Sequence, residues 1–102
     1  MELNRQSLTS FFLQNGFTYA DQKTDFGQVF PNVDYLYLCK GKDKHIYLSV
    51  VYYQDKLCEV VVACYITKFN SRKFTEKYPL SCPSLLRDEN QIQQLIQTIN
   101  NL

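Results

Sequence analysis

Apolar residues recur with a helical period at both ends of the chain. Near the start, three of them fall at positions i, i+3 and i+4, which lie on one face of an α-helix: Leu8, Phe11 and Phe12. Asn4 is a suitable N-cap, and Gly16 is a suitable stop because glycine readily adopts the left-handed conformation at a helix end. The pattern therefore predicts a helix over about Arg5–Asn15.

The second helical stripe is close to the end of the chain. Its apolar positions are spaced i, i+3, i+4 and i+7: Ile92, Leu95, Ile96 and Ile99. Asp88 precedes them, and Gln91 three residues later completes a sequence that resembles a capping box. We expect a helix over about Glu89–Asn101.

Between the helices the pattern changes to a period of two. Three segments are rich in β-branched and aromatic residues and are separated by short polar stretches: Tyr35–Cys39, His45–Tyr53 and Cys58–Thr67. This order predicts an antiparallel meander. Phe17–Ala20 and Gln28–Phe30 are weaker strand candidates, and a further strand or a short helical turn is expected within residues 68–87.

The two faces of the predicted sheet differ, because side chains alternate along a strand. Even-numbered positions are almost all apolar, whereas odd-numbered positions are mixed and rich in tyrosine. A one-residue slip would exchange the faces, so the strands should pair like with like. The first hairpin should then pair these residues: Leu38 with Ile46, Leu36 with Leu48, Tyr37 with Tyr47, and Cys39 with His45.

Two amphipathic helices require one apolar sheet face to cover. We therefore predict an α+β fold: a two-layer sandwich with an N-terminal helix, an antiparallel meander of about four strands, and a C-terminal helix packed on one sheet face. The length of 102 residues suits a single domain over 1–102.

Composition bears on whether the protein enters a membrane and on the state of its cysteines. Hydrophobic residues make up 45% of the chain, but no run approaches the about 18 apolar residues of a membrane span. No signal peptide is visible, so we expect a soluble, cytoplasmic protein that does not bind membranes. The four cysteines lack zinc-site spacing and are expected to be reduced, mostly buried thiols.

Catalytic motifs are scarce. Cys39, Asp43 and His45 supply the residue types of a nucleophile, an orienting acid and a base. Any hairpin can bring a cysteine beside a histidine, however, and nothing in the sequence suggests an oxyanion hole. We interpret His45 as a strand-end residue beside a half-buried thiol, and we expect a protein that is not an enzyme and has neither a metal site nor a cofactor.

Charge is distributed unevenly along the chain. The formal net charge is only +1, but residues 40–77 carry eight basic and four acidic residues, a net +4. A meander brings much of this charge to one end of the sheet, as a basic patch of Lys40, Lys42, Lys44, Lys68, Arg72 and Lys73. Such a patch can bind nucleic acid or an acidic protein, or can simply keep turns soluble.

The odd-numbered sheet face is the second candidate surface, because two short helices can cover only one face. Its expected protein-binding residues are Tyr35, Tyr37, Tyr47, Val51 and Tyr65. Tyrosine is common at protein interfaces, and an exposed apolar patch usually has a partner. That partner is a different protein or a second copy of the chain. Alternatively, residues 68–86 fold across this face themselves.

We therefore expect a non-enzymatic protein-binding module, a small inhibitor or adaptor. Small motif-free chains are common among such proteins, including phage or mobile-element inhibitors of a host defence nuclease, as in anti-CRISPR proteins. The comparison with phage or mobile-element inhibitors rests only on the small size of the chain and on its lack of motifs. The alternative is a nucleic-acid-binding protein that uses the basic hairpin and residues 68–77.

Overall fold

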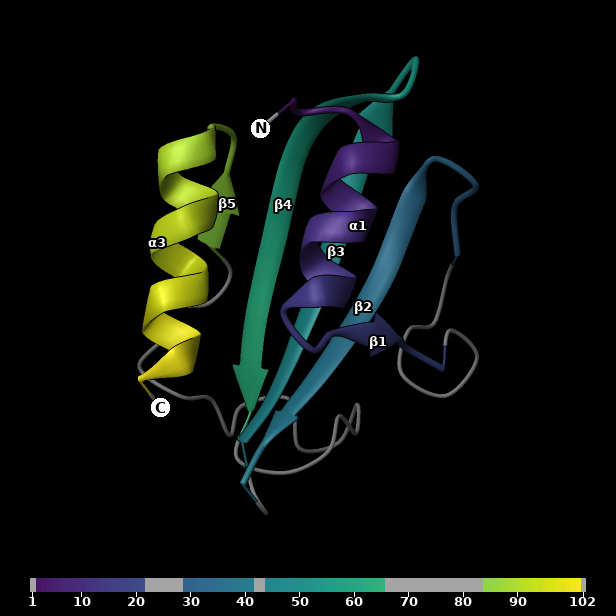
Figure 1. The fold of residues 1–102 in the computed structure, drawn as a ribbon. Coiled ribbons are helices and arrows are strands. Elements are labelled where there is room, and N and C mark those ends of the chain that lie inside the picture. Colours follow the sequence, from purple (N-terminus) through teal and green to yellow (C-terminus); the bar gives the residue numbers. More distant parts are fainter. Residues whose placement is uncertain (1, 22–28, 42–43, 66–83, 102) are drawn as a thin grey trace.

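A computed structural model describes residues 2–21, 29–41, 44–65 and 84–101 of the chain. The elements in chain order are α1 (Arg5–Gln14), β1 (Thr18–Tyr19), β2 (Val33–Lys40), β3 (Lys44–Tyr53), β4 (Lys56–Tyr65), β5 (Ser84–Leu86) and α3 (Glu89–Asn100). The strands form one five-stranded sheet in the order β1-β2-β3-β4-β5, and each is antiparallel to the next (Figure 1). The predicted helix–meander–helix order is confirmed.

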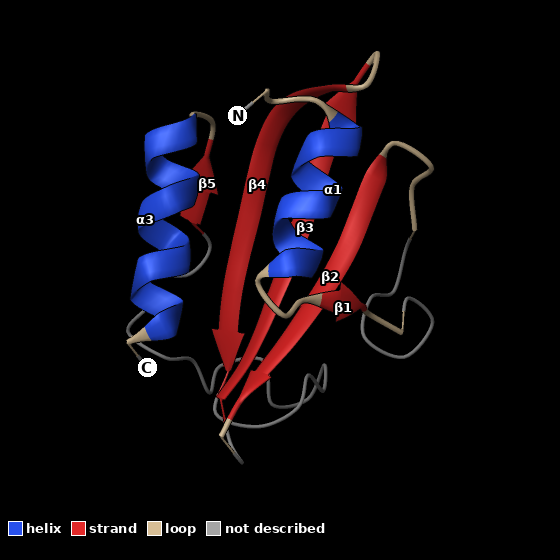
Figure 2. Cartoon of the chain, in the orientation of Figure 1, coloured by secondary structure: helices blue, strands red, loops and turns tan. Residues whose placement is uncertain are grey.

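Both helices lie on the same face of the sheet, and together with it they make the two layers of the predicted sandwich (Figure 2). The even-numbered side chains of β2 and β3 point into this interface, where Leu36, Ile46, Leu48 and Val50 are fully buried. The apolar stripes of both helices complete the core with these residues: Leu8, Phe12, Ile92, Leu95, Ile96 and Ile99. The separation of the apolar and tyrosine-rich positions into two faces therefore positions the helices.

The predicted register of the first hairpin is confirmed. Leu36 pairs with Leu48, Leu38 with Ile46, Tyr37 with Tyr47, and Cys39 with His45. The meander also places the β2–β3 hairpin and the end of β4 at one end of the sheet, because His45 pairs with Tyr65.

Side chains cap both helices as predicted. Asn4 Oδ1 accepts a hydrogen bond from the Ser7 amide at 2.9 Å, and Gly16, just after α1, has a φ of +93°. At α3, Asp88 Oδ1 accepts from the Gln91 amide at 2.8 Å, and Gln91 Oε1 accepts in return from the Asp88 amide at 3.3 Å. Each cap satisfies amides that the helix itself cannot pair.

The β3–β4 connection differs from the expected loop over residues 54–57. It is a two-residue turn in which Gln54 and Asp55 have positive φ values of 52° and 62°. A bulge follows, because Val51 pairs with Glu59 while Tyr52 pairs with Leu57. The extra residue changes the parity of β4 at this point, so that Leu57 packs on the core and Cys58 is exposed.

Two of the weaker strand predictions have different outcomes. The strand expected over Phe17–Ala20 exists as the short β1, whereas Val29 and Phe30 are not in a strand. Phe30 instead begins a turn through Pro31, in which its carbonyl accepts from the Val33 amide at 3.2 Å. Gln28 and residues 66–83 lie outside the described residues, and the strand expected within 68–87 is represented by β5.

In the part of the chain that the structure describes, neither helix is long and apolar enough to cross a membrane.

Candidate functional site

The sheet face opposite the helices carries the predicted binding tyrosines, and we call it the tyrosine face. Its described members are the odd-numbered residues Tyr35, Tyr37, Tyr47 and Val51. The backbone of Tyr65 pairs with His45 at one end of this face, while the side chain of Tyr65 lies outside the described residues. Register therefore brings the four described members onto one side of the sheet.

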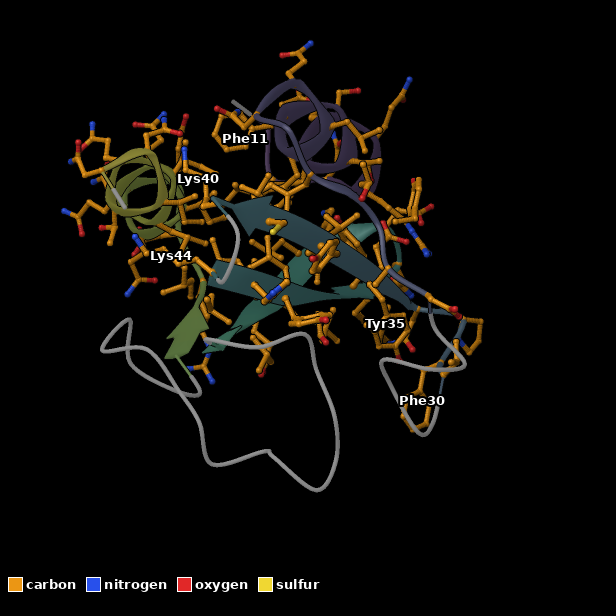
Figure 3. The ribbon with its side chains drawn as sticks, turned by 90° about the horizontal axis from the view of Figure 1, so that it is seen from below. Phe11, Phe30, Tyr35, Lys40 and Lys44 are labelled. Carbon is orange, nitrogen blue, oxygen red and sulfur yellow. The ribbon has the colours of Figure 1, made fainter. Side chains whose placement is uncertain are left out.

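Two of these tyrosines are not exposed as expected. Tyr35 and Tyr47 are only 4% and 3% accessible, whereas Tyr37 and Val51 are half-buried. The hydroxyl of Tyr35 accepts a hydrogen bond from the Phe30 amide at 3.0 Å, which brings the turn before β2 back over the end of the face. Figure 3 shows Phe30 beside Tyr35, on the side of the sheet away from the helices.

The exposed apolar groups near Tyr35 and the end of β3 lie outside the predicted set of binding residues, although parity already assigned Tyr53 to this face. Phe30 is 48% accessible, Tyr53 is 68% accessible, and Val29 is 44% accessible. Tyr53 has the same parity as Val51 and extends the face along β3, while Phe30 reaches it through its turn. Pro31-Asn32, a common turn dipeptide, was the available signal that Phe30 precedes a reversal rather than continuing a strand.

An aromatic cluster occupies the other end of the face. The Tyr37 ring lies 5.1 Å from the Tyr47 ring and is stacked on His45 with 5.9 Å between centroids. The Tyr37 hydroxyl and His45 Nδ1 are 2.6 Å apart. A histidine nitrogen held in this way orients the ring and fixes Tyr37 in place.

Cys39 and His45 are neighbours in register, but their polar atoms have other partners. Cys39 Sγ donates to the Gly41 carbonyl at 3.4 Å, and His45 Nδ1 faces Tyr37. Cys39 and Cys58 are both free and exposed, so the expectation that the thiols are mostly buried is wrong for these two. Asp43 lies outside the described residues, as do Cys82 and the side chain of Cys64.

The basic patch is described only in part. Lys40 and Lys44 face each other across the β2–β3 hairpin and are both partly buried. Figure 3 labels both at the end of the sheet remote from Phe30. Lys42, Lys68, Arg72 and Lys73 lie outside the described residues, so the gathering of the whole patch stays a prediction.

Among residues 2–21, 29–41, 44–65 and 84–101, no group of three or more His, Cys, Asp or Glu side chains is placed to hold a metal ion. No protein-family model matches the chain, and neither a curated protein nor a solved structure matches it. The function must therefore be argued from the geometry of the chain itself.

Proposed function

We propose that this protein is a non-enzymatic binding module, an inhibitor or adaptor that docks a partner protein on its tyrosine face. One observation carries the proposal: Phe30 and Tyr53 both expose large aromatic side chains. Figure 3 places Phe30 on the face that neither helix covers, and alternation along β3 places Tyr53 on that face with the half-buried Val51. Aromatic side chains supply much of the binding energy at protein interfaces.

The burial of Tyr35 and Tyr47 gives this surface a rigid base. Both side chains are buried, and the hydrogen bond from the Phe30 amide to the Tyr35 hydroxyl holds the turn against the sheet. A preorganised surface loses little conformational entropy when a partner binds. We therefore place the binding energy in Phe30 and Tyr53, supported by Val51 and Tyr37, and give the buried tyrosines a supporting role.

The test compares two matched variants with the parent. Phe30→Ser with Tyr53→Ser removes both exposed rings, whereas Leu13→Ser removes a 41% accessible apolar side chain from α1 in the opposite layer. Tagged proteins are used to capture partners from cells of the source organism. A protein recovered with the parent is then produced in pure form and its affinity is measured by calorimetry.

The proposal expects the double variant to weaken this affinity by at least about tenfold, since two interface aromatics contribute more than about 1 kcal/mol each. Leu13→Ser should bind like the parent, and all three proteins should give the same circular dichroism spectrum. Equal binding by the double variant and the parent would refute the use of this face.

The pairing of Lys40 with Lys44 supports a second candidate, which is nucleic-acid binding at the basic hairpin. Nuclease treatment of the captured material separates the two functions. Loss of every partner after nuclease treatment, together with a salt-sensitive shift of RNA or DNA by the pure protein, would favour the second candidate.

A further inference from the structure

A shallow groove lies on the helix side of the sheet, at the edge that β1 forms. Its lining comes from α1, β1, β2 and the β3–β4 turn, and consists of Arg5, Gln6, Thr9, Ser10, Tyr19, Asp34 and Asp55. The fold brings these segments together from distant parts of the chain (Figure 1). The groove is separate from the tyrosine face and does not depend on the function proposed for that face.

Arg5 is the one cation in the described lining of the groove, and it is already neutralised. Arg5 Nη2 donates to Asp34 Oδ1 at 2.7 Å, and Arg5 Nε donates to Asp34 Oδ2 at 3.3 Å. A further hydrogen bond joins Arg5 Nη2 to the Pro31 carbonyl at 3.1 Å. The hydrogen bonds to Asp34 raise the pKa of Arg5, so the pair stays ionised and contributes no net charge to the groove.

Asp55 supplies an uncompensated negative charge. Within the described part of the chain its carboxylate takes part in no ion pair. Its backbone is held in place, because the Asp55 carbonyl accepts from the Arg5 amide at 2.8 Å. Its φ of 62° is a strained value for a residue with a side chain. The groove therefore has a net negative charge at a fixed position.

A buried tyrosine, which is not part of the groove lining, packs against Arg5, while an exposed tyrosine belongs to the lining. Tyr52 is 2% accessible, its ring lies 5.2 Å from Arg5 Cζ, and its hydroxyl has no hydrogen-bond partner among the described residues. Burial raises the pKa of Tyr52 to about 12, with Thr9 and Asp34 next to its hydroxyl. Tyr19, which lines the groove, is 58% accessible, and a cation can stack on an exposed tyrosine ring.

We propose that this groove binds the guanidinium group of an arginine side chain from a partner protein. Several elements contribute residues with acceptor groups to the lining: Asp55 comes from the turn, and Gln6 and Ser10 come from α1. A guanidinium carries five donors in a planar fork and stacks on aromatic rings, whereas a lysine ammonium is a compact, strongly hydrated charge. A divalent cation needs several free oxygen ligands, whereas Asp55 is the one ionised group of the described lining that takes part in no ion pair.

The probe is acetyl-arginine amide, titrated into the isotope-labelled protein at low ionic strength. Acetyl-citrulline amide is the matched control, because citrulline keeps the shape of arginine without its charge. We expect saturable shifts of the Ser10, Tyr19 and Asp55 amide resonances with the arginine probe only. The affinity derived from these shifts should fall as salt is added, because salt screens charges at an exposed site.

Two variants of equal charge change test the position of the site. Asp55→Asn keeps a residue that tolerates positive φ and should weaken arginine binding about tenfold, the usual cost of losing a hydrogen bond between charged groups. Glu2→Gln removes an exposed carboxylate outside the groove and should leave the affinity unchanged. Tyr19→Leu should weaken binding more modestly than Asp55→Asn.

Three results would overturn the proposal. The first is equal shifts with the citrulline probe, and the second is equal weakening by Asp55→Asn and Glu2→Gln, which would show general attraction to a negative surface. The third is tighter binding of free arginine than of the capped probe, which would assign the groove to an amino acid and not to a protein side chain. Because none of these variants alters Phe30 or Tyr53, failure here leaves the proposed function of the tyrosine face untouched.

Discussion

Tyr52→Phe is expected to stabilise the protein, although it deletes a polar group from the interior. The Tyr52 hydroxyl is buried against α1 and lacks a hydrogen-bond partner in the described residues. The nearby Thr9 hydroxyl lowers the pKa of Tyr52 but forms no hydrogen bond of ordinary geometry with it, and it donates to Asp34 Oδ2 at 3.1 Å. An unpaired buried hydroxyl costs about 1–3 kcal/mol relative to its hydrated state in the unfolded chain. Removing it relieves this cost, while the remaining phenyl ring still packs beneath Arg5.

The oxygen atom also fills space, and its loss leaves a small gap that offsets part of the gain. We therefore expect a net gain of about 1 kcal/mol in the free energy of unfolding. For a domain of about 100 residues this raises the Tm by roughly 4–8 °C. Urea denaturation followed by circular dichroism measures the free energy directly, and a thermal scan measures the Tm.

Tyr53→Phe is the matched control, because it removes the hydroxyl of the adjacent tyrosine, which is 68% accessible. Its unfolding free energy should stay within about 0.5 kcal/mol of the parent value. A loss of more than about 1 kcal/mol in Tyr52→Phe would refute the reasoning, since it would show that the hydroxyl is hydrogen-bonded in the native protein.

Alkaline pH gives an independent measure of the same burial. Desolvation raises the pKa of Tyr52 from 10.0 to about 12. Above pH 10 the unfolded hydroxyl releases its proton while the folded one keeps it, so this group lowers stability as the pH rises from about 10 to about 12. Tyr52→Phe lacks this loss, and its advantage over the parent should therefore widen across that interval. A constant difference would contradict the raised pKa.

Two further predictions follow from the capping box and from the bulge. Asp88→Ala should lower the free energy of unfolding by about 1 kcal/mol in urea titrations, because it leaves the Gln91 amide without its acceptor. Asn90→Ala changes an exposed residue in the same helical turn and should lower the free energy of unfolding by less. Equal losses in the two variants would refute the role of the cap. Cys39 and Cys58 should react with a maleimide in the folded protein, as peptide mapping by mass spectrometry would show, and protection of Cys58 until unfolding would refute its outward position after the bulge.

Local sequence patterns were sufficient to predict the limits of the helices and the register of the first hairpin. Asn4 and Gly16 mark the limits of α1, and Asp88 with Gln91 marks the start of α3, because caps depend on residues only a few positions away. The β2–β3 register followed from alternation, since a slip would bury the mixed face and expose the apolar one.

The bulge in β4 was not predictable in the same way. Parity assigned Cys58 to the core, but Leu57 takes that place once the chain leaves the tight turn at Gln54 and Asp55. Segments distant in sequence hold this geometry, as the Leu57 amide donates to the Leu3 carbonyl at 2.9 Å and the Arg5 amide donates to the Asp55 carbonyl at 2.8 Å. No local signal in the strand carries that information.

The sequence by itself determined that two amphipathic helices cover the apolar face of an antiparallel sheet, because hydrophobic period and strand parity act over a few residues. Only the tertiary structure decided which groups on the other face are accessible. It buried Tyr35 and Tyr47 and left Phe30 and Tyr53 exposed. It also brought Arg5, Asp34 and Asp55 into one groove. Both outcomes depend on contacts between segments far apart in the chain. Hydrophobic period and strand parity report only on neighbouring residues, so they cannot predict those contacts.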